Sequence, residues 1–132
     1  MTHTDGSFRI GALAARSGRG IHTIRWYETQ GLMPGVSRDS GGRRVYTELH
    51  VGWLALMERL RRTGMTIAQM REYTALVKQG RPTLRRRKDL LSAHRARVER
   101  TIADWNAALT LIDQKIDYYE EWLATGERPR QK

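Results

Sequence analysis

The stretch of sequence that decides the fold is Ile10–Tyr46, which reads IGALAARSGRGIHTIRWYETQGLMPGVSRDSGGRRVY. Apolar residues at spacings i, i+3 and i+4 predict a short helix over residues 10–16, which Ser17–Gly18 interrupts. The pattern resumes and predicts a second helix over residues 21–30, with Gly31 as a left-handed stop. Two short helices joined by a tight turn are the arrangement that lays the second helix in the major groove of DNA.

The residues after the second helix predict a two-stranded wing over residues 32–46, with a Gly41–Gly42 turn at its tip. Asp39 is the acidic neighbour, along the sequence, of three wing arginines: Arg38, Arg43 and Arg44. A solvated hairpin tip would account for one arginine more readily than for three. We therefore expect these arginines to contact phosphates or the minor groove, and Tyr46 follows them as a further contact residue.

The second helix has two distinct faces. At about 100° per residue, Ile21, Ile24 and Tyr27 share one face, which we expect to pack on the first helix and the wing. The opposite face carries the side chains left for DNA: His22, Arg25, Trp26 and Thr29. The arginine can bind guanine O6 and N7 or a phosphate, and the sequence does not decide between them. The histidine and the tryptophan are expected on the DNA backbone, and ordinary surface positions are the competing interpretation for Arg25 and Trp26.

Two further helices are expected after the wing. Thr47 is the predicted N-cap of the third helix, whose apolar residues keep helical spacing: Leu49, Trp53, Leu56, Met57 and Leu60. Gly64 ends this helix, and Arg61 near its end is a candidate phosphate contact, with solvated helix surface as the alternative. A capping box over Thr66–Gln69 starts the fourth helix, which residues 80–82 end because they contain glycine and proline.

A long helix is expected at the end of the chain. No proline or glycine occurs from Leu84 to Leu123, so at ~1.5 Å rise per residue this helix is about 60 Å long. From Val98 its apolar residues are spaced four and three in alternation, which is typical of a coiled-coil seam. The preceding residues cannot bury so long and narrow a stripe alone, so we expect a second copy of the chain to cover it. The predicted dimerisation residues are Leu91, Val98, Ile102, Trp105, Leu109, Ile112, Ile116, Tyr119 and Leu123.

The charges along this helix are unequally distributed. Residues 81–100 contain eight basic side chains and two acidic ones, whereas residues 101–123 contain five acidic side chains and one basic one. A parallel pair would place like charges together, whereas an antiparallel pair places the basic start of one helix beside the acidic end of the other. We therefore predict an antiparallel dimer that crosses near Trp105. Solvated charges are the alternative, because exposed ion pairs contribute only ~0–1 kcal/mol each.

The composition favours a polyanionic partner. The 132 residues contain 24 Lys and Arg against 14 Asp and Glu, which gives a formal net charge of +10. The absence of cysteine excludes disulfides, thiolate metal sites and thiol redox switches, and the four histidines show no metal-ligand spacing. We find no nucleophile motif or phosphate loop, so we expect no enzyme activity, no cofactor and no bound metal. No apolar run reaches the length of a membrane span and no secretory signal opens the chain, so we expect a cytoplasmic protein without membrane contact.

The expected organisation has four parts. These are a disordered tail over residues 1–7, a winged helix-turn-helix domain with a helix pair over residues 8–80, a dimerisation helix over residues 81–123 and a basic flexible tail over residues 124–132. The predicted fold class is mainly α, with the long C-terminal helix forming an antiparallel coiled-coil dimer.

Together these motifs resemble the MerR family of bacterial transcription regulators, over Phe8 to about Leu123. The most specific pieces are IGALA from Ile10, TIRWYE from Thr23, GLMP from Gly31, GRRVYT from Gly42 and RRTGMTI from Arg61. The resemblance implies the winged helix-turn-helix (the head), the helix pair and the antiparallel dimerisation helix expected above. It also implies DNA contacts at His22, Arg25, Trp26, Arg38, Arg44, Tyr46 and Arg61.

Two residues depart from the family pattern. Trp26 stands where Tyr or Phe is usual, which keeps a planar ring. Arg43 stands where an aromatic residue is common, so we expect the wing tip of this chain to contact DNA differently.

The resemblance further implies a mechanism. Members of the family bind as dimers between two promoter elements whose spacer is too long for RNA polymerase to engage both. Effector binding then bends and untwists the DNA so that the elements align, and the bending costs of order 1–6 kcal/mol.

The effector is left open by the sequence. The metal- and oxidant-sensing branches of the family use cysteines, which this chain lacks, and we expect no separate ligand domain in the residues after Leu123. A small organic effector and no effector are both open. The alternative functions are an effector-independent repressor or a DNA-bending architectural protein and, from another class, a coiled-coil adaptor for an acidic protein or membrane.

Overall fold

The structure, a computed structural model, describes residues 6–130 and divides the chain into two compact units at Leu91 and Ser92. The first unit therefore extends past the domain boundary expected at residue 80. The predicted disordered tail lies outside the described residues up to residue 5. Ser7, however, is buried, because the segment that follows pairs with the end of the wing.

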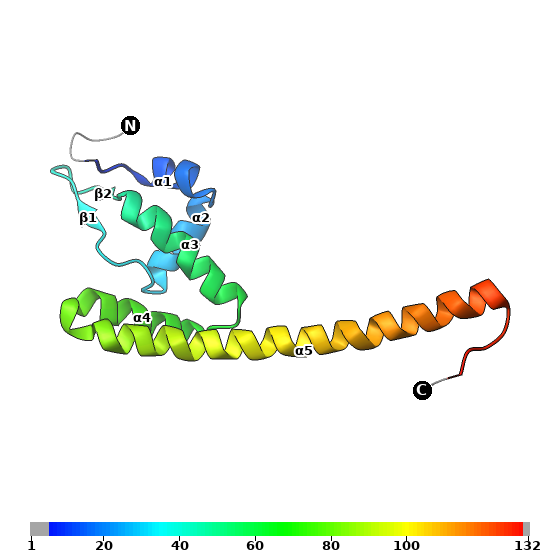
Figure 1. The fold of residues 1–132 in the computed structure, drawn as a ribbon. Coiled ribbons are helices and arrows are strands. Elements are labelled where there is room, and N and C mark those ends of the chain that lie inside the picture. The colour runs from blue at the N-terminus through cyan, green and yellow to red at the C-terminus, as the bar shows by residue number, and fades with distance from the viewer. Residues whose placement is uncertain (1–5, 131–132) are drawn as a thin grey trace. The chain divides into compact units, whose positions relative to one another are not determined.

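The first unit contains the expected helices and wing (Figure 1). Its elements are α1 (Ile10–Ser17), α2 (Ile21–Thr29), β1 (Ser37–Arg38), β2 (Arg44–Val45), α3 (Glu48–Arg62), α4 (Ile67–Gln79), the short 3-10 helix η1 (Arg81–Thr83) and the start of α5 (Leu84–Thr125). The two strands are antiparallel, and Arg38 lies opposite Arg44. The predicted winged helix-turn-helix and the helix pair are confirmed.

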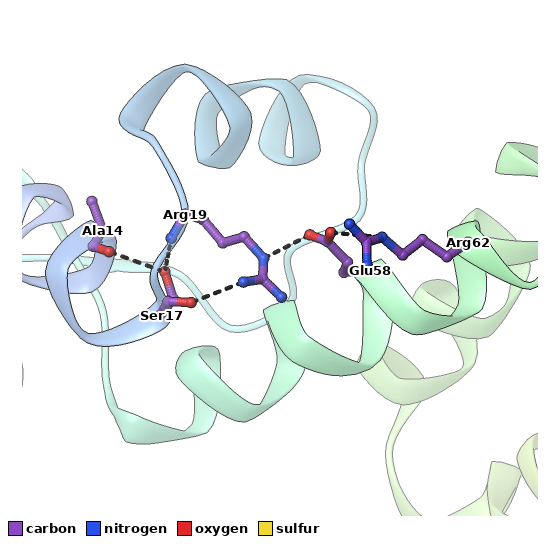
Figure 2. A network of polar contacts seen from close by, with 5 residues as sticks. All are labelled: Ala14, Ser17, Arg19, Glu58 and Arg62. Carbon is purple, nitrogen blue, oxygen red and sulfur yellow. Dashed lines mark hydrogen bonds and ion pairs between the residues drawn. The ribbon is translucent and has the colours of Figure 1, made fainter.

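The turn between α1 and α2 is fastened to α3 by a polar network (Figure 2). Gly18 ends α1 at a φ of 69°, a left-handed conformation that glycine adopts without strain. Next to it, Arg19 donates to the Ser17 carbonyl at 3.1 Å, and its Nε lies 2.6 Å from a carboxylate oxygen of Glu58. Glu58 also pairs with Arg62 at 3.2 Å. Because Glu58 and Arg62 belong to α3, this network holds the turn of the helix-turn-helix on the next helix.

The core of the first unit forms where α1 packs on α2 and α3, and α3 on α4. Its fully buried residues come from every part of the head: Phe8, Leu13, Ile24, Tyr27, Leu32, Leu54, Met57 and Met70. Helical spacing did not mark burial at every position of α3, and the expected packing of Ile21 was wrong. Leu49 is 84% exposed, whereas Leu54, five residues later on another face of α3, is fully buried and lies in the core. Ile21 is also exposed, since it lies in the first turn of α2, ahead of the contact made by Ile24.

The junction from α4 to α5 is closed by backbone and side-chain hydrogen bonds. The predicted capping box at the start of α4 is present, with both bonds between Thr66 and Gln69 formed at 3.0 and 3.1 Å. At the other end, Arg87 donates to the Gly80 carbonyl at 2.6 Å and to the Thr83 hydroxyl at 2.9 Å. Leu91, expected in the dimer seam, packs against the core of its own head.

The second unit is the remainder of α5, which ends at Thr125, and the residues that follow it. The predicted seam is exposed along this helix: Trp105 is 73% and Leu109 55% exposed, and the same holds for Ile102, Ile112, Ile116, Tyr119 and Leu123. Val98 is half-buried. Among the described residues, no helix combines the length and apolar character that crossing a membrane requires.

Candidate nucleic-acid interface

The outward face of α2 carries the side chains that the sequence predicted for it. His22, Arg25 and Trp26 are exposed, whereas Ile24 and Tyr27 are buried in the core. The Trp26 ring meets the Tyr27 ring edge to face, with centroids 5.2 Å apart. A large aromatic side chain that stays exposed while its neighbour is buried is available for a partner.

A hollow between α2 and α3 brings three predicted site residues together. This α2–α3 hollow, of about 320 Å³, is lined by His22, Thr23, Trp26, Tyr27 and Arg61. The neighbouring Tyr27 hydroxyl raises the pKa of the Arg61 guanidinium above its ordinary value. Arg61 therefore lies beside the exposed face of α2, although 35 residues of sequence separate it from Trp26.

A second hollow joins α2 to the wing and to the residue before α1. This arginine hollow, of about 210 Å³, is lined by Arg9, Ile10, Arg25, Arg43, Arg44 and Tyr46. It unites Arg25, Arg43 and Arg44, which the sequence predicted separately. Arg9 was missed; the available signal was a basic residue directly before the first helix, which becomes the N-cap residue of α1.

Glu28 connects the recognition helix to the wing. Its carboxylate lies 2.9 Å from Nη1 of Arg44 and accepts a hydrogen bond from the Tyr46 hydroxyl, and the Glu28 side chain is only 11% exposed. Asp39 is therefore not the only acidic residue near the wing arginines, because α2 supplies a second one through folding.

Tyr46 is 1% exposed, which corrects its expected role as a direct DNA contact. Burial, followed by the hydrogen bond to Glu28, raises the pKa of Tyr46 above its ordinary value. Its backbone also pairs with Phe8 in both directions, at 2.7 and 2.8 Å. Tyr46 positions the elements around it.

The wing turn is held by Asp39 and Arg38. The Asp39 carboxylate accepts backbone N–H bonds from Gly41 and Arg43, both at 2.9 Å, and these bonds hold the pKa of Asp39 below its usual value, the Arg43 bond most strongly. Arg38 donates to the Gly42 carbonyl at 2.7 Å, so part of its hydrogen-bonding capacity serves the turn itself. Arg38 also lines a third hollow, of about 230 Å³, with Arg44 and Lys78.

The described residues contain no cluster of three or more His, Asp or Glu side chains that could hold a metal ion. The chemistry that these hollows provide is that of guanidinium and indole N–H donors on a surface of positive charge. Such donors bind phosphate and base-edge acceptors, and they perform no bond-making step by themselves.

Comparisons with known proteins identify the family of this chain. The model of the MerR HTH family regulatory proteins matches residues 8–76, and the MerR DNA-binding model matches residues 51–116. An uncharacterized HTH-type transcriptional regulator of Haemophilus influenzae is 30% identical over 113 residues, which cover 86% of this chain and 84% of the relative.

Two crystal structures are similar over almost the whole chain. A putative MerR family transcriptional regulator from Listeria monocytogenes has a TM-score of 0.82 and 32% identity, and covers 90% of each chain. HiNmlR, described as a MerR family regulator lacking the sensor domain and bound to promoter DNA, has a TM-score of 0.76 and 28% identity, with 92% of this chain and 96% of that chain covered. Members of this family are DNA-binding regulators and not enzymes. The chain belongs to the MerR family and is a DNA-binding transcription regulator.

Proposed function

We propose that the protein binds promoter DNA as a homodimer and controls transcription by bending and untwisting the promoter spacer. One observation carries the proposal: side chains from α2, the wing and the end of α3 line two neighbouring hollows on the same unit. Contacts from three elements can fix the register of a protein on a duplex, which a single basic helix cannot do.

In this proposal α2 lies in the major groove. Arg25 reads a guanine or a phosphate, and His22 and Trp26 contact the backbone beside it. Arg61 reaches a flanking phosphate from α3. The wing arginines Arg38, Arg43 and Arg44 contact phosphates or the minor groove, and Tyr46 supports them from inside the fold.

The exposed seam of α5 supports the homodimer. Large apolar side chains exposed at coiled-coil spacing lose water contact when a second copy covers them, and each well-buried one contributes about 1.5–3 kcal/mol. The proposed partner helix runs antiparallel, since this arrangement opposes the basic start of α5 to its acidic end. Two heads held by one dimer would read an inverted repeat.

The regulatory step is indirect readout of DNA shape. Bending a site of 20–30 base pairs costs of order 1–6 kcal/mol, and contacts along both heads must offset that cost. RNA polymerase is then affected indirectly, through the alignment of promoter elements. Because promoter DNA is the partner, we propose that the protein acts in the bacterial cytoplasm.

The alternative is an effector-independent repressor or architectural protein that bends DNA without a signal. The similarity to HiNmlR, described as lacking the sensor domain, supports this alternative as much as it supports a small organic effector. Transcription with purified polymerase separates the two. A regulator that responds to a signal changes transcript yield when its effector is added, whereas an architectural protein gives the same yield throughout.

The first experiment selects bound duplexes from a random-sequence library and measures the number of chains bound to the selected DNA. Two chains on an inverted repeat support the proposal. Affinity that collapses as salt rises, with no common sequence, would contradict it, since non-specific binding depends on phosphates alone.

Variants test the interface on the selected duplex. We expect Arg25→Ala to weaken binding by about 1–3 kcal/mol if the arginine makes a bidentate base contact. Arg59→Ala is the matched control, because Arg59 is also an exposed arginine but lies on α3 outside both hollows. Equal losses from the two variants would show that general charge, and not the interface, governs binding.

A further inference from the structure

We propose that the arginine hollow seats one phosphate of the DNA backbone and that Arg9 is one of its ligands. Arg9 precedes α1 and lies outside both the recognition helix and the wing. The inference rests on the proposed function, and it assigns a specific ligand to a residue that is not among the DNA contacts implied by the family resemblance.

The fold holds Arg9 at this place through its neighbour. Phe8 is fully buried, and its backbone N–H and C=O both bond to Tyr46 at the end of the wing. Arg9 follows in an extended conformation and starts α1. Its Nη2 lies 3.6 Å from a carboxylate oxygen of Asp39. The base of the Arg9 side chain is therefore fixed beside the wing, while the side chain itself stays half exposed.

The charges around the hollow do not balance. Four guanidinium groups line it, from Arg9, Arg25, Arg43 and Arg44. Two carboxylates approach them: Glu28 pairs with Arg44, and Asp39 lies near Arg9. Four positive charges minus two negative charges leave an excess of two. Within residues 6–130 no hydrogen bond or ion pair engages the side chains of Arg25 and Arg43.

This arrangement fits an anion with several acceptor oxygens. Each guanidinium offers five N–H donors in a planar fork, so the contacts to Glu28 and Asp39 leave donors of Arg44 and Arg9 unused. The side chains of Ile10 and Tyr46 complete the lining of the hollow.

A backbone phosphate fits better than a base edge. Base recognition uses one arginine in a bidentate pair with guanine, whereas here arginines from three elements surround one small space. A phosphate carries a full negative charge and occurs at every nucleotide step, so it can bring these like charges together. Bound there, it would connect the segment before α1, α2 and the wing at a single point of the duplex.

The test uses the full-length protein and the operator obtained by selection, with single phosphates replaced by neutral methylphosphonates. We expect this replacement to weaken wild-type binding at several positions, and one of them in each half-site is the phosphate seated in the arginine hollow, identified as the position where neutralisation also removes the effect of an Arg9 substitution. We expect Arg9→Gln to weaken binding to the unmodified operator about tenfold, as for loss of a charge-assisted hydrogen bond. On the operator that is neutral at the identified position, the Arg9→Gln variant and the wild type should bind with equal affinity. Arg43→Gln should behave in the same way, and Arg9→Lys should retain part of the affinity.

Arg59→Gln is the matched control, since it removes one positive charge from an exposed position outside the hollow. Its effect should be small and equal on modified and unmodified operators. The logarithmic salt dependence of binding should become shallower by up to about 1.8 for Arg9→Gln, because the dimer loses two phosphate contacts of about 0.9 each.

Two results would overturn the proposal. One is an Arg9→Gln variant that binds the unmodified operator as tightly as the wild type. The other is an Arg9→Gln loss of the same size at every methylphosphonate position, which would make Arg9 a source of general attraction only. A wild-type protein that selects no operator would refute the proposed function itself, whereas selection of an operator combined with either result refutes the phosphate seat alone.

Discussion

Leu13, Leu54 and Met57 in the first unit are fully buried, whereas Trp105 and Leu109 in the second unit are exposed over more than half of their surface. Both units keep a regular helical spacing of apolar residues. In the first, several helices cross and cover one another's apolar faces. In the second, a single helix has no other element of the same unit against it.

The comparison shows that the same periodic spacing of apolar residues can indicate two different kinds of packing. A short apolar stripe in a chain with several helices indicates a core within one chain. A long stripe at alternating spacings of four and three, on one isolated helix, indicates a surface for a partner. The following predictions test this difference, beginning with the largest effect.

The first prediction tests whether the exposed seam of the second unit holds two chains together. Leu109→Asp should raise the dissociation constant of the homodimer about a thousandfold, or about 4 kcal/mol, because it removes an apolar side chain from both copies and places a charge in the seam. Sedimentation velocity at several concentrations measures it. The control is Leu111→Asp: Leu111 is similarly exposed but lies outside the seam spacing. Equal dissociation in both variants would argue against the seam.

The second prediction concerns the core of the first unit. Leu54→Ala should lower the free energy of unfolding by about 2–5 kcal/mol, since a fully buried side chain would leave a cavity. Urea denaturation followed by circular dichroism measures the change. Leu49→Ala, on the same helix but 84% exposed, should change stability by less than about 0.5 kcal/mol. The assignment of the core would be contradicted by equal effects.

The third prediction asks whether the first unit is also preorganised for its function. Glu28→Gln should weaken operator binding by about 1–2 kcal/mol, because the carboxylate that holds Arg44 and Tyr46 loses its charge. Simple electrostatics predicts the opposite change in affinity, because removal of an acidic side chain near DNA should strengthen binding. Glu72→Gln provides the comparison, since Glu72 is exposed on α4 and has no ion pair among the described residues. Tighter binding by Glu28→Gln would refute the positioning role.

The smallest expected effect concerns the stabilisation of one helix end by its own capping residues. Thr66→Ala should lower the free energy of unfolding by about 1 kcal/mol, because it removes one half of the capping box at the start of α4. Thr110→Ala serves as the control, because the hydroxyl of Thr110 donates to the carbonyl of Asn106 within its own helix and caps no helix end. Thermal unfolding of both variants would measure the difference. Equal stabilities would show that the capping box does not contribute to the free energy of unfolding.

The helices of this protein were largely predictable because their signals are local. The helix ends at Gly18 and Gly31, the N-caps at Thr47 and Thr66, and the proline break at residue 82 each act within a few residues. The errors arose where local periodicity competes with tertiary contact. Leu49 keeps helical spacing but lies in the first turn of α3, where no other element covers it.

The candidate site was predictable residue by residue, but its groupings were not. His22, Arg25 and Trp26 followed from the face of one helix. That Arg61 lies beside this face, and that Tyr46 of the wing is buried, depends on how α3 and the wing pack on α2.

The amino-acid sequence by itself determined the order and type of the elements, the basic surface and the exposed coiled-coil seam, since composition, capping and periodicity are properties of neighbouring residues. Only the tertiary structure decided which charges meet. The ion pair of Glu28 with Arg44 joins two segments that are far apart in the chain, and so does the shared hollow of Arg9, Arg25 and Arg43. Arg9 reaches that hollow because the backbone of Phe8 pairs with that of Tyr46 at the end of the wing.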